Sequence, residues 1–342
     1  MIPVVRVSGG PEERGRAVGK ALAEPIHRSL SFYRGYLERR GVGLDSLPRL
    51  LRSYRSAAEA HLPALVAEVD ALAEGADADP WEIFAVNAFE ELEPALSEPS
   101  VERCTSFTAA SPGATILGHN EQWLAGDLGN VAVVVATPSD GPAFASPTVA
   151  TCLPAVGMNS AGLAQAIMSL TAGDDREGIP RVLVSRHSLQ ANYTEDAIKR
   201  AGIEGRAGGY AHMFAGGTGE AFTVETTADR LAVLEGPGAH TNHYLHQDLT
   251  LIGARPREGS RSRLERARAL LSASPPATPQ EAMALLADHE GDPQPICLHP
   301  DPDEGDDAEA VVFSMVCHLE ERRMWVAAGP PCFTPFEEIE VA

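Results

Sequence analysis

Apolar residues recur at helical spacing through the N-terminal third of the chain. The first such run predicts a helix and has apolar side chains three or four positions apart, at Val18, Leu22, Ile26, Leu30 and Tyr33. A second helical zone covers Leu50 to Glu74, and a shorter one covers Trp81 to Glu91. Prolines and acidic residues from Glu93 to Ser100 then interrupt the pattern, which predicts a linker leading to Cys104.

Beyond Cys104, short β-prone runs alternate with glycine and proline turns. The predicted strands are Thr105–Ala109, Thr115–Gly118, Val131–Thr137, Phe144–Leu153, Gly162–Ser169, Tyr210–Ala215, Glu220–Thr226, Leu231–Leu234, Ala310–Leu319 and Arg323–Ala328. The predicted helices are Pro180–Gln190, Thr194–Ala201, Ser260–Ser272 and Ala282–Ala287. Regular strand–helix alternation is missing, which favours an α+β fold with largely antiparallel sheets over a doubly wound parallel sheet.

Composition and charge narrow the range of partners. An apolar fraction of 44% and a charged fraction of 22% are typical of a soluble globular protein. The net charge of -21 disfavours nucleic acid and anionic membranes as partners. No segment has the pattern of a signal peptide or a transmembrane helix, so we expect a cytoplasmic protein.

The cysteines do not suggest a disulfide framework or a metal site. The five cysteines are odd in number and widely spaced, so reduced thiols are expected. No Cys-x-x-Cys pair is present, and the sequence therefore predicts neither a structural zinc site nor a cofactor. His240, His243 and His246 do not share one face of a helix or strand, and the acidic loop Asp301–Glu309 lacks EF-hand spacing, so structural or solvated roles are favoured for both.

Cys104 lies at the boundary between the helical segment and the β-rich segment. One interpretation is a small buried hydrophobic residue, which is common for free cysteine. The other is a nucleophile, because Arg103-Cys104-Thr105 has the look of a self-cleavage site. Cutting the bond before Cys104 would free an α-amine with a pKa of about 7.7–8.0, which can serve as the general base for the thiol.

Two asparagines are candidate donors to an oxyanion. Asn159 lies in a turn between two predicted strands, and Asn242 lies where a strand is expected to end. A neutral amide N–H can stabilise a developing oxyanion, although asparagine is equally common in turns for local reasons. His119 to Gln122 end the strand predicted to pair with that of Cys104, so this segment is expected beside the nucleophile or, alternatively, to be a polar strand end.

These motifs together resemble the isopenicillin-N acyltransferase family of N-terminal-nucleophile hydrolases, and more distantly the penicillin V acylase and bile-salt hydrolase group. The resemblance covers almost the whole chain and rests on the order of its motifs: CTSF (104–107), GHNEQW (118–123), GMNSAGL (157–163), HTNHY (240–244), SRSRLERA (260–267), ICLHPD (296–301) and RRMWVAAGPPC (322–332).

The resemblance implies a single domain with a four-layer αββα sandwich. Cleavage between Arg103 and Cys104 would give an α segment, 1–103, which stays packed as a subunit against a β segment, 104–342. It implies that Cys104 is the nucleophile and that Asn242, with Asn159, is an oxyanion donor. Arg263 matches an arginine that lines the active site. The residues expected to bind the substrate or support the site are Thr105, His119, Asn120, Glu121 and His243.

Gln122 departs from the family pattern. Relatives commonly carry an acid there, thought to orient the nucleophile's amine, whereas an amide keeps hydrogen bonding without the charge. The expected function is a self-cleaving cysteine amidohydrolase or acyltransferase. It would act through a thioester on a small amide, with water favoured over an acceptor amine. An uncleaved binding or structural protein is the alternative that Gln122 leaves open. A papain-like hydrolase is weaker, because no histidine stands in a recognisable pairing context.

Overall fold

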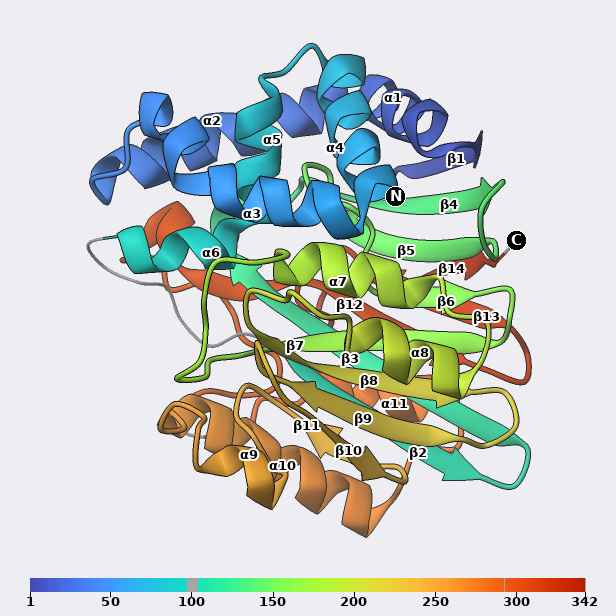
Figure 1. Ribbon diagram of the computed structural model, residues 1–342. Helices are drawn as coiled ribbons and strands as arrows, with labels where there is room; N and C mark the ends of the chain where they lie inside the picture. The colour runs from blue at the N-terminus through green and yellow to red at the C-terminus, as the bar shows by residue number, and fades with distance from the viewer. Residues whose placement is uncertain (97–103, 292, 342) are drawn as a thin grey trace.

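Two β-sheets lie face to face and carry helices on their outer faces (Figure 1). The computed structural model describes residues 1–96, 104–291 and 293–341. Helices α7 and α8 cover one sheet, and α10 and α11 cover the other. This arrangement confirms the predicted α+β class and the four αββα layers.

The larger sheet has eight strands. Their spatial order is β1 (Val4–Gly9), β4 (Val131–Pro138), β5 (Phe144–Val149), β6 (Gly157–Asn159), β7 (Leu163–Leu170), β8 (Gly209–Gly216), β9 (Ala221–Thr226) and β10 (Leu231–Glu235). Strand β1 runs parallel to β4, with Val4 opposite Val133, and every other neighbouring pair in this sheet is antiparallel.

The smaller sheet has six strands and contains Cys104 at its margin. Their order is β11 (Ala239–His240), β2 (Thr105–Ser111), β3 (Ala114–Leu124), β12 (Glu309–His318), β13 (Arg323–Ala327) and β14 (Glu337–Glu340), all antiparallel. The β2–β3 hairpin turns at Ser111-Pro112-Gly113 and pairs Thr105 with Asn120. With this register, residues 121–124 of β3 extend beyond the first residue of β2.

The helices follow the predicted positions closely. They are α1 (Pro11–Ala21), α2 (Ala23–Arg39), α3 (Leu47–His61), α4 (Pro63–Ala76), α5 (Pro80–Asn87), α6 (Phe89–Leu92), α7 (Arg181–Leu189), α8 (Thr194–Ala201), α9 (Gln247–Thr250), α10 (Glu258–Ala273) and α11 (Pro279–Leu286). Short 3-10 turns cover η1 (Leu44–Ser46), η2 (Glu93–Ala95), η3 (Ala125–Asp127) and η4 (Gly305–Asp307). The start of α11 has a capping box, in which the Thr278 hydroxyl accepts from Glu281 N–H and the Glu281 carboxylate accepts from Thr278 N–H.

The sequence predicted only helices in the N-terminal region, but the structure shows that this region also contains a strand. It opens with β1, whose residues alternate between exposed and half-buried positions as an edge strand does. Strands β6, β11 and β14 were also missed, and each has only two to four residues. Such short strands leave little periodicity to detect.

A continuous apolar core joins the N-terminal helices to the space between the sheets. It includes Leu30 and Phe89 from the helices and Val133, Met213 and Met315 from the sheets. Burying each large apolar side chain contributes about 1.5–3 kcal/mol, so the two parts of the chain stabilise one another. Among the described residues, no helix is both long and apolar enough to cross a membrane.

Candidate active site

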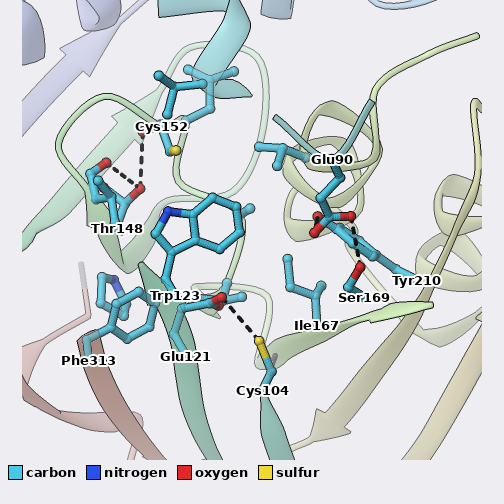
Figure 2. Close-up of a pocket in the computed structure, with 17 residues that line it drawn as sticks. Glu90, Cys104, Glu121, Trp123, Thr148, Cys152, Ile167, Ser169, Tyr210 and Phe313 are labelled. Atoms are coloured by element: carbon cyan, nitrogen blue, oxygen red, sulfur yellow. Dashed lines mark hydrogen bonds between the residues drawn. The ribbon is translucent and has the colours of Figure 1, made fainter. Parts of the chain in front are cut away.

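Cys104 lies immediately before β2, with its side chain between the two sheets. The residue is buried, and its φ of 85° is in the left-handed region that non-glycine residues rarely adopt. Its thiol donates a hydrogen bond to Glu121 Oε1 at 3.1 Å (Figure 2). Arg103 and the rest of 97–103 lie outside the described residues, so the cleavage site is described on one side only.

Glu121 continues this contact into a chain of buried polar groups. Its second oxygen lies 3.0 Å from His119 Nε2, and His119 Nδ1 lies 2.8 Å from Ser106 Oγ. Residues 119 and 121 share a face of β3 because side chains alternate along a strand. The result is a hydrogen-bonded path from the Cys104 thiol through a carboxylate and an imidazole to a hydroxyl.

The surroundings keep the Cys104 thiol protonated. Burial raises its pKa well above the usual range, and the negative charge of Glu121 raises it further. The backbone N–H of Gln122 and the charge of Arg263 act in the opposite direction but do not reverse the shift. Because a thiol reacts as its thiolate, this thiol could act as a nucleophile only with a nearby proton acceptor, and Glu121 is in contact with it.

Arg263 joins three parts of the site. It is fully buried on α10 and donates to the carbonyl oxygen of Cys104, to Thr105 Oγ1 at 3.0 Å and to Asn242 Oδ1 at 3.1 Å. The Asn242 amide in turn donates to Ser169 O at 3.2 Å, in the opposite sheet. The guanidinium therefore places a positive charge at the Cys104 carbonyl and holds the side-chain oxygen of Asn242.

Ser260 fixes the end of β11 from the same helix face as Arg263. Its hydroxyl accepts from Asn242 N–H at 2.9 Å and lies 2.7 Å from His243 Nδ1. Burial lowers the pKa of His243 to about 4, with neighbouring cations adding to the effect, so its ring is neutral near neutral pH. His243 thus supports the loop that carries Asn242.

Three other predicted site residues, Asn159, Asn120 and Gln122, form their hydrogen bonds away from Cys104. The Asn159 amide donates to Leu189 O and Ala191 O, both at 2.8 Å, and its oxygen accepts from backbone N–H groups of the next turn. Asn120 and Gln122 both donate to Ile296 O, at 2.9 and 3.3 Å, on the face of β3 opposite Glu121. Gln122 Oε1 is buried and has no hydrogen-bond partner among the residues that the structure describes.

A small cavity of about 70 Å³ adjoins the thiol (Figure 2). Most of its wall is apolar and is formed by Val86, Trp123, Pro147, Val149, Leu153, Ala155, Val156, Ile167, Val182 and Phe313. One polar group of side chains faces it: Glu90 accepts from Ser169 Oγ at 2.9 Å and from Tyr210 Oη at 3.1 Å. Burial raises the pKa of Tyr210 well above its usual range, so the hydroxyl remains a donor.

Sequence reasoning did not single out Glu90, Ser169 or Tyr210. The one available signal was a pair of acids, Glu90 and Glu91, in an otherwise apolar helical stretch. Both carboxylates face the buried guanidinium of Arg181, at 3.6 and 2.9 Å. Adjacent acids within apolar sequence therefore marked a buried ion pair next to the cavity.

Cys104 also belongs to a group of three side chains that could ligate a metal ion. One ligand atom from each of Cys104, His119 and Glu121 lies within 4.8 Å of the others. Both Glu121 oxygens are already hydrogen-bonded, and the Arg263 cation lies on the other side of Cys104, which favours proton transfer over ligation. The His240 ring instead pairs with Glu225 Oε1 at 2.7 Å, and His246 caps α9, so the histidine run does not converge.

Sequence comparisons relate the chain to a family of acyltransferases. The family model for acyl-coenzyme A:6-aminopenicillanic acid acyl-transferase matches residues 109–332. The 40 kDa form of acyl-coenzyme A:6-aminopenicillanic-acid-acyltransferase from Emericella nidulans is 25% identical over 334 residues, covering 96% of this chain and 92% of that protein. The chain belongs to the acyl-coenzyme A:6-aminopenicillanic acid acyl-transferase family, which confirms the resemblance in its sequence motifs.

Two solved structures show a more distant likeness. A variant of conjugated bile acid hydrolase from Clostridium perfringens is 14% identical with a TM-score of 0.47, and the match covers 69% of this chain and 92% of that one. Penicillin V acylase from Agrobacterium tumefaciens is 13% identical with a TM-score of 0.47, covering 69% and 86%. No residue role is assigned from these two matches.

Proposed function

We propose that the protein is a self-cleaving cysteine amidohydrolase or N-acyltransferase that acts on a small N-acyl amide. The observation that carries the proposal is the buried Cys104 thiol, which is hydrogen-bonded to Glu121 while its carbonyl accepts from Arg263. The thiol and its proton acceptor thus line an apolar cavity, and a fixed positive charge contacts the backbone carbonyl of the same cysteine. Those are the groups that acyl transfer to a thiol requires.

Self-cleavage is the first reaction. Glu121 takes the thiol proton, and the Cys104 sulfur attacks the carbonyl carbon of Arg103. The C–N bond breaks, the Cys104 nitrogen takes the proton from Glu121, and a thioester links Arg103 to the sulfur. Water then hydrolyses the thioester and releases the thiol with a free α-amine. The positive φ of Cys104 supports this step, because strained backbone is concentrated at reactive sites and cleavage would release the strain.

Substrate turnover would use the same thiol with its new α-amine as general base. The sulfur attacks the amide carbonyl of the substrate, and the leaving amine takes the proton from the α-amine. Asn242 and Arg263 are proposed to stabilise the oxyanion, because Arg263 is hydrogen-bonded both to the Cys104 carbonyl and to the Asn242 side chain. Asn159 is left out of this role, since its amide is committed to two carbonyls of another loop.

The cavity suggests an apolar acyl group. Its walls are mostly aliphatic and aromatic, and its two carboxylates, Glu90 and Glu121, disfavour an anionic acyl chain. The acceptor of the acyl group is water or an amine. In this proposal residues 1–103 and 104–342 are two segments of one domain that remain packed together after the cut.

The alternative is an uncleaved relative that binds a ligand or serves a structural role. Gln122 supports it, because no carboxylate occupies the position where relatives commonly carry one. In the enzyme proposal Glu121 supplies that carboxylate from the neighbouring position. The two proposals differ in whether the polypeptide is cut.

The intact mass of the freshly purified protein tests the proposal. We expect two fragments that divide between Arg103 and Cys104, and an intact chain of 36.2 kDa in Cys104→Ala. Cys152→Ala is the matched control, since Cys152 also lines the cavity but lies on another wall. A wild-type chain that stays whole and hydrolyses no amide, or a Cys104→Ala chain that is still cut, would refute the assignment.

A further inference from the structure

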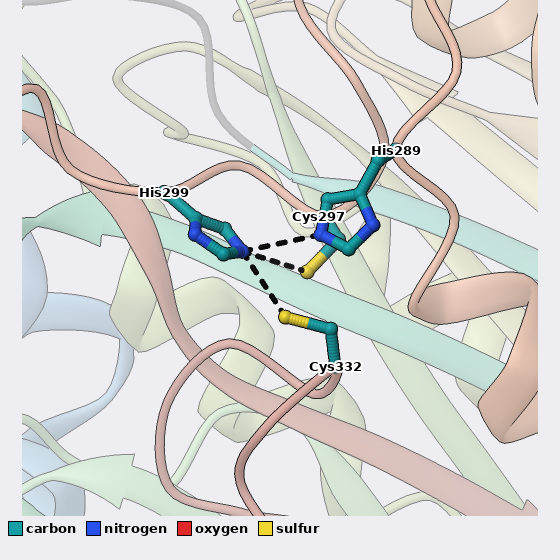
Figure 3. A group of neighbouring side chains, drawn as sticks. All are labelled: His289, Cys297, His299 and Cys332. Carbon is teal, nitrogen blue, oxygen red and sulfur yellow. Dashed lines mark hydrogen bonds between the residues drawn. The ribbon is translucent and has the colours of Figure 1, made fainter.

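Four metal-ligating side chains meet at a place far from Cys104 in the sequence. His289, Cys297 and His299 come from the loop between α11 and β12, and Cys332 comes from the loop between β13 and β14. One ligand atom from each lies within 4.8 Å of all the others. Figure 3 shows the four side chains pointing toward a common centre from these separate loops.

The separations fit a tetrahedral ion. Zinc binds Cys sulfur at about 2.3 Å and His nitrogen at about 2.0–2.1 Å, which places neighbouring tetrahedral ligands about 3.3–3.8 Å apart. His299 Nε2 lies 3.2 Å from His289 Nε2, 3.7 Å from Cys297 Sγ and 3.1 Å from Cys332 Sγ. Small side-chain movements would therefore complete the coordination sphere.

We propose that His289, Cys297, His299 and Cys332 form a structural zinc site. Two thiolates and two imidazoles are a donor set that favours zinc over magnesium or calcium, which prefer oxygen. All four positions are filled by the protein, and this is the arrangement of structural zinc sites, whereas catalytic sites keep a position open. Three of the four residues are solvent-exposed, which provides an entry path for the ion.

The ion would join the loop between β13 and β14 to the loop between α11 and β12, which supports the active site. Ile296, next to Cys297, accepts hydrogen bonds from Asn120 and Gln122, which flank Glu121 on β3. The same loop accepts from Ser262, next to Arg263, through Gln294 O at 3.0 Å. Zinc would thus hold the backbone against which β3 and α10 are positioned, without touching the reacting atoms.

This site gives a role to Cys297, His299 and Cys332 in the motifs ICLHPD and RRMWVAAGPPC, which have no part in the acyl-transfer proposal. Because the chain contains no Cys-x-x-Cys pair, a zinc site was not predicted from the sequence. The ligands instead come from two loops that the fold brings together, with the buried Cys297 at the base of the group. The proposal is independent of self-cleavage, because none of the four residues contacts Cys104 or Glu121 in the described structure.

Zinc content measured by mass spectrometry tests this site. The full chain is expressed with added zinc, kept reduced and dialysed against metal-free buffer. We expect one zinc per chain in the wild type, and a fall to background in Cys332→Ser and His289→Ala, which change different loops. Cobalt substitution should give the visible d–d bands of a tetrahedral ion and a thiolate charge-transfer band in the wild type only.

Matched controls separate this site from other sources of zinc. His27→Ala changes an exposed histidine elsewhere, and Cys104→Ala removes a ligand from the other candidate group; both should keep one zinc per chain. Circular dichroism checks that each variant is folded. Zinc retained by folded Cys332→Ser, zinc lost in Cys104→Ala, or a Cys297–Cys332 disulfide in the zinc-supplemented, reduced protein would overturn the proposal.

Discussion

Replacing Glu121 by glutamine separates its role as a proton acceptor from its shape. The amide has nearly the size of the carboxylate and keeps an oxygen that can accept from the Cys104 thiol, which now lies 3.1 Å from Glu121 Oε1. It cannot take up the proton. Self-cleavage in Glu121→Gln should therefore slow by about 10²–10⁴-fold near neutral pH, the usual contribution of a general base.

The pH dependence distinguishes this mechanism from a merely structural effect. Removing the negative charge lowers the pKa of Cys104 relative to the wild type, but burial is the larger cause of the raised pKa and remains. The variant must rely on the small fraction of thiolate, so its rate should rise by about tenfold per pH unit. The wild-type rate does not depend on that fraction and should change much less with pH, so the gap between the two rates should narrow as the pH rises.

Cell-free synthesis followed by intact mass measurement gives the cleavage rate before processing is complete. Glu90→Gln is the matched control, because Glu90 lines the same cavity but hydrogen-bonds to Ser169 and Tyr210. It should keep the wild-type cleavage rate. A Glu121→Gln chain that is cut as fast as the wild type between about pH 6 and 9 would remove Glu121 from the mechanism.

Two further predictions concern residues that hold loops in place. Asn159→Asp would leave Leu189 O and Ala191 O without their donor, at a cost of about 1–3 kcal/mol for each unpaired carbonyl. The urea midpoint of the variant should therefore fall while kcat of the folded enzyme is kept. A loss of about 10²-fold in kcat would instead restore an oxyanion role for Asn159. Burial alone would raise the pKa of Glu225, but hydrogen bonds from His240 and two backbone N–H groups lower it. Its stabilisation is therefore complete above the unfolded pKa of about 4.3 and is lost as the pH falls through the lower folded value. Glu225→Gln should cost about 1.5–3 kcal/mol in urea unfolding at neutral pH and almost nothing well below about pH 4, and an equal cost at both would contradict this reasoning.

The β2–β3 hairpin shows how far the sequence leads toward the site. The turn at Ser111-Pro112-Gly113 and its flanking β-prone runs were sufficient to place residues 119–122 near Cys104. They did not show whether Glu121 or Gln122 faces Cys104, because a one-residue change of register moves every side chain to the other face of the sheet. The observed pairing of Thr105 with Asn120 puts Glu121 on the face of Cys104 and Gln122 on the opposite one.

Other features depend on contacts between distant segments. Arg263 was singled out from its motif, but its bonds to Cys104, Thr105 and Asn242 join residues that the sequence keeps far apart. Asn159 and Asn242 have similar turn contexts, and only their packing shows that Asn242 contacts Arg263 whereas Asn159 contacts the carbonyls of another loop. His289 and Cys332 lie in irregular loops, where no periodicity reports the path of the chain.

The first strand has a consequence for how the polypeptide is built. β1 precedes the proposed cut yet forms the edge of the larger sheet beside β4, while Ile2 N–H donates to Glu337 Oε1 in β14 of the smaller sheet at 2.8 Å. Residues 104–342 made alone would leave β4 as an unprotected sheet edge, which invites pairing with other chains. The N-terminal segment therefore covers this edge, and cutting the peptide bond proposed before Cys104 would leave the strand pairing of both sheets intact.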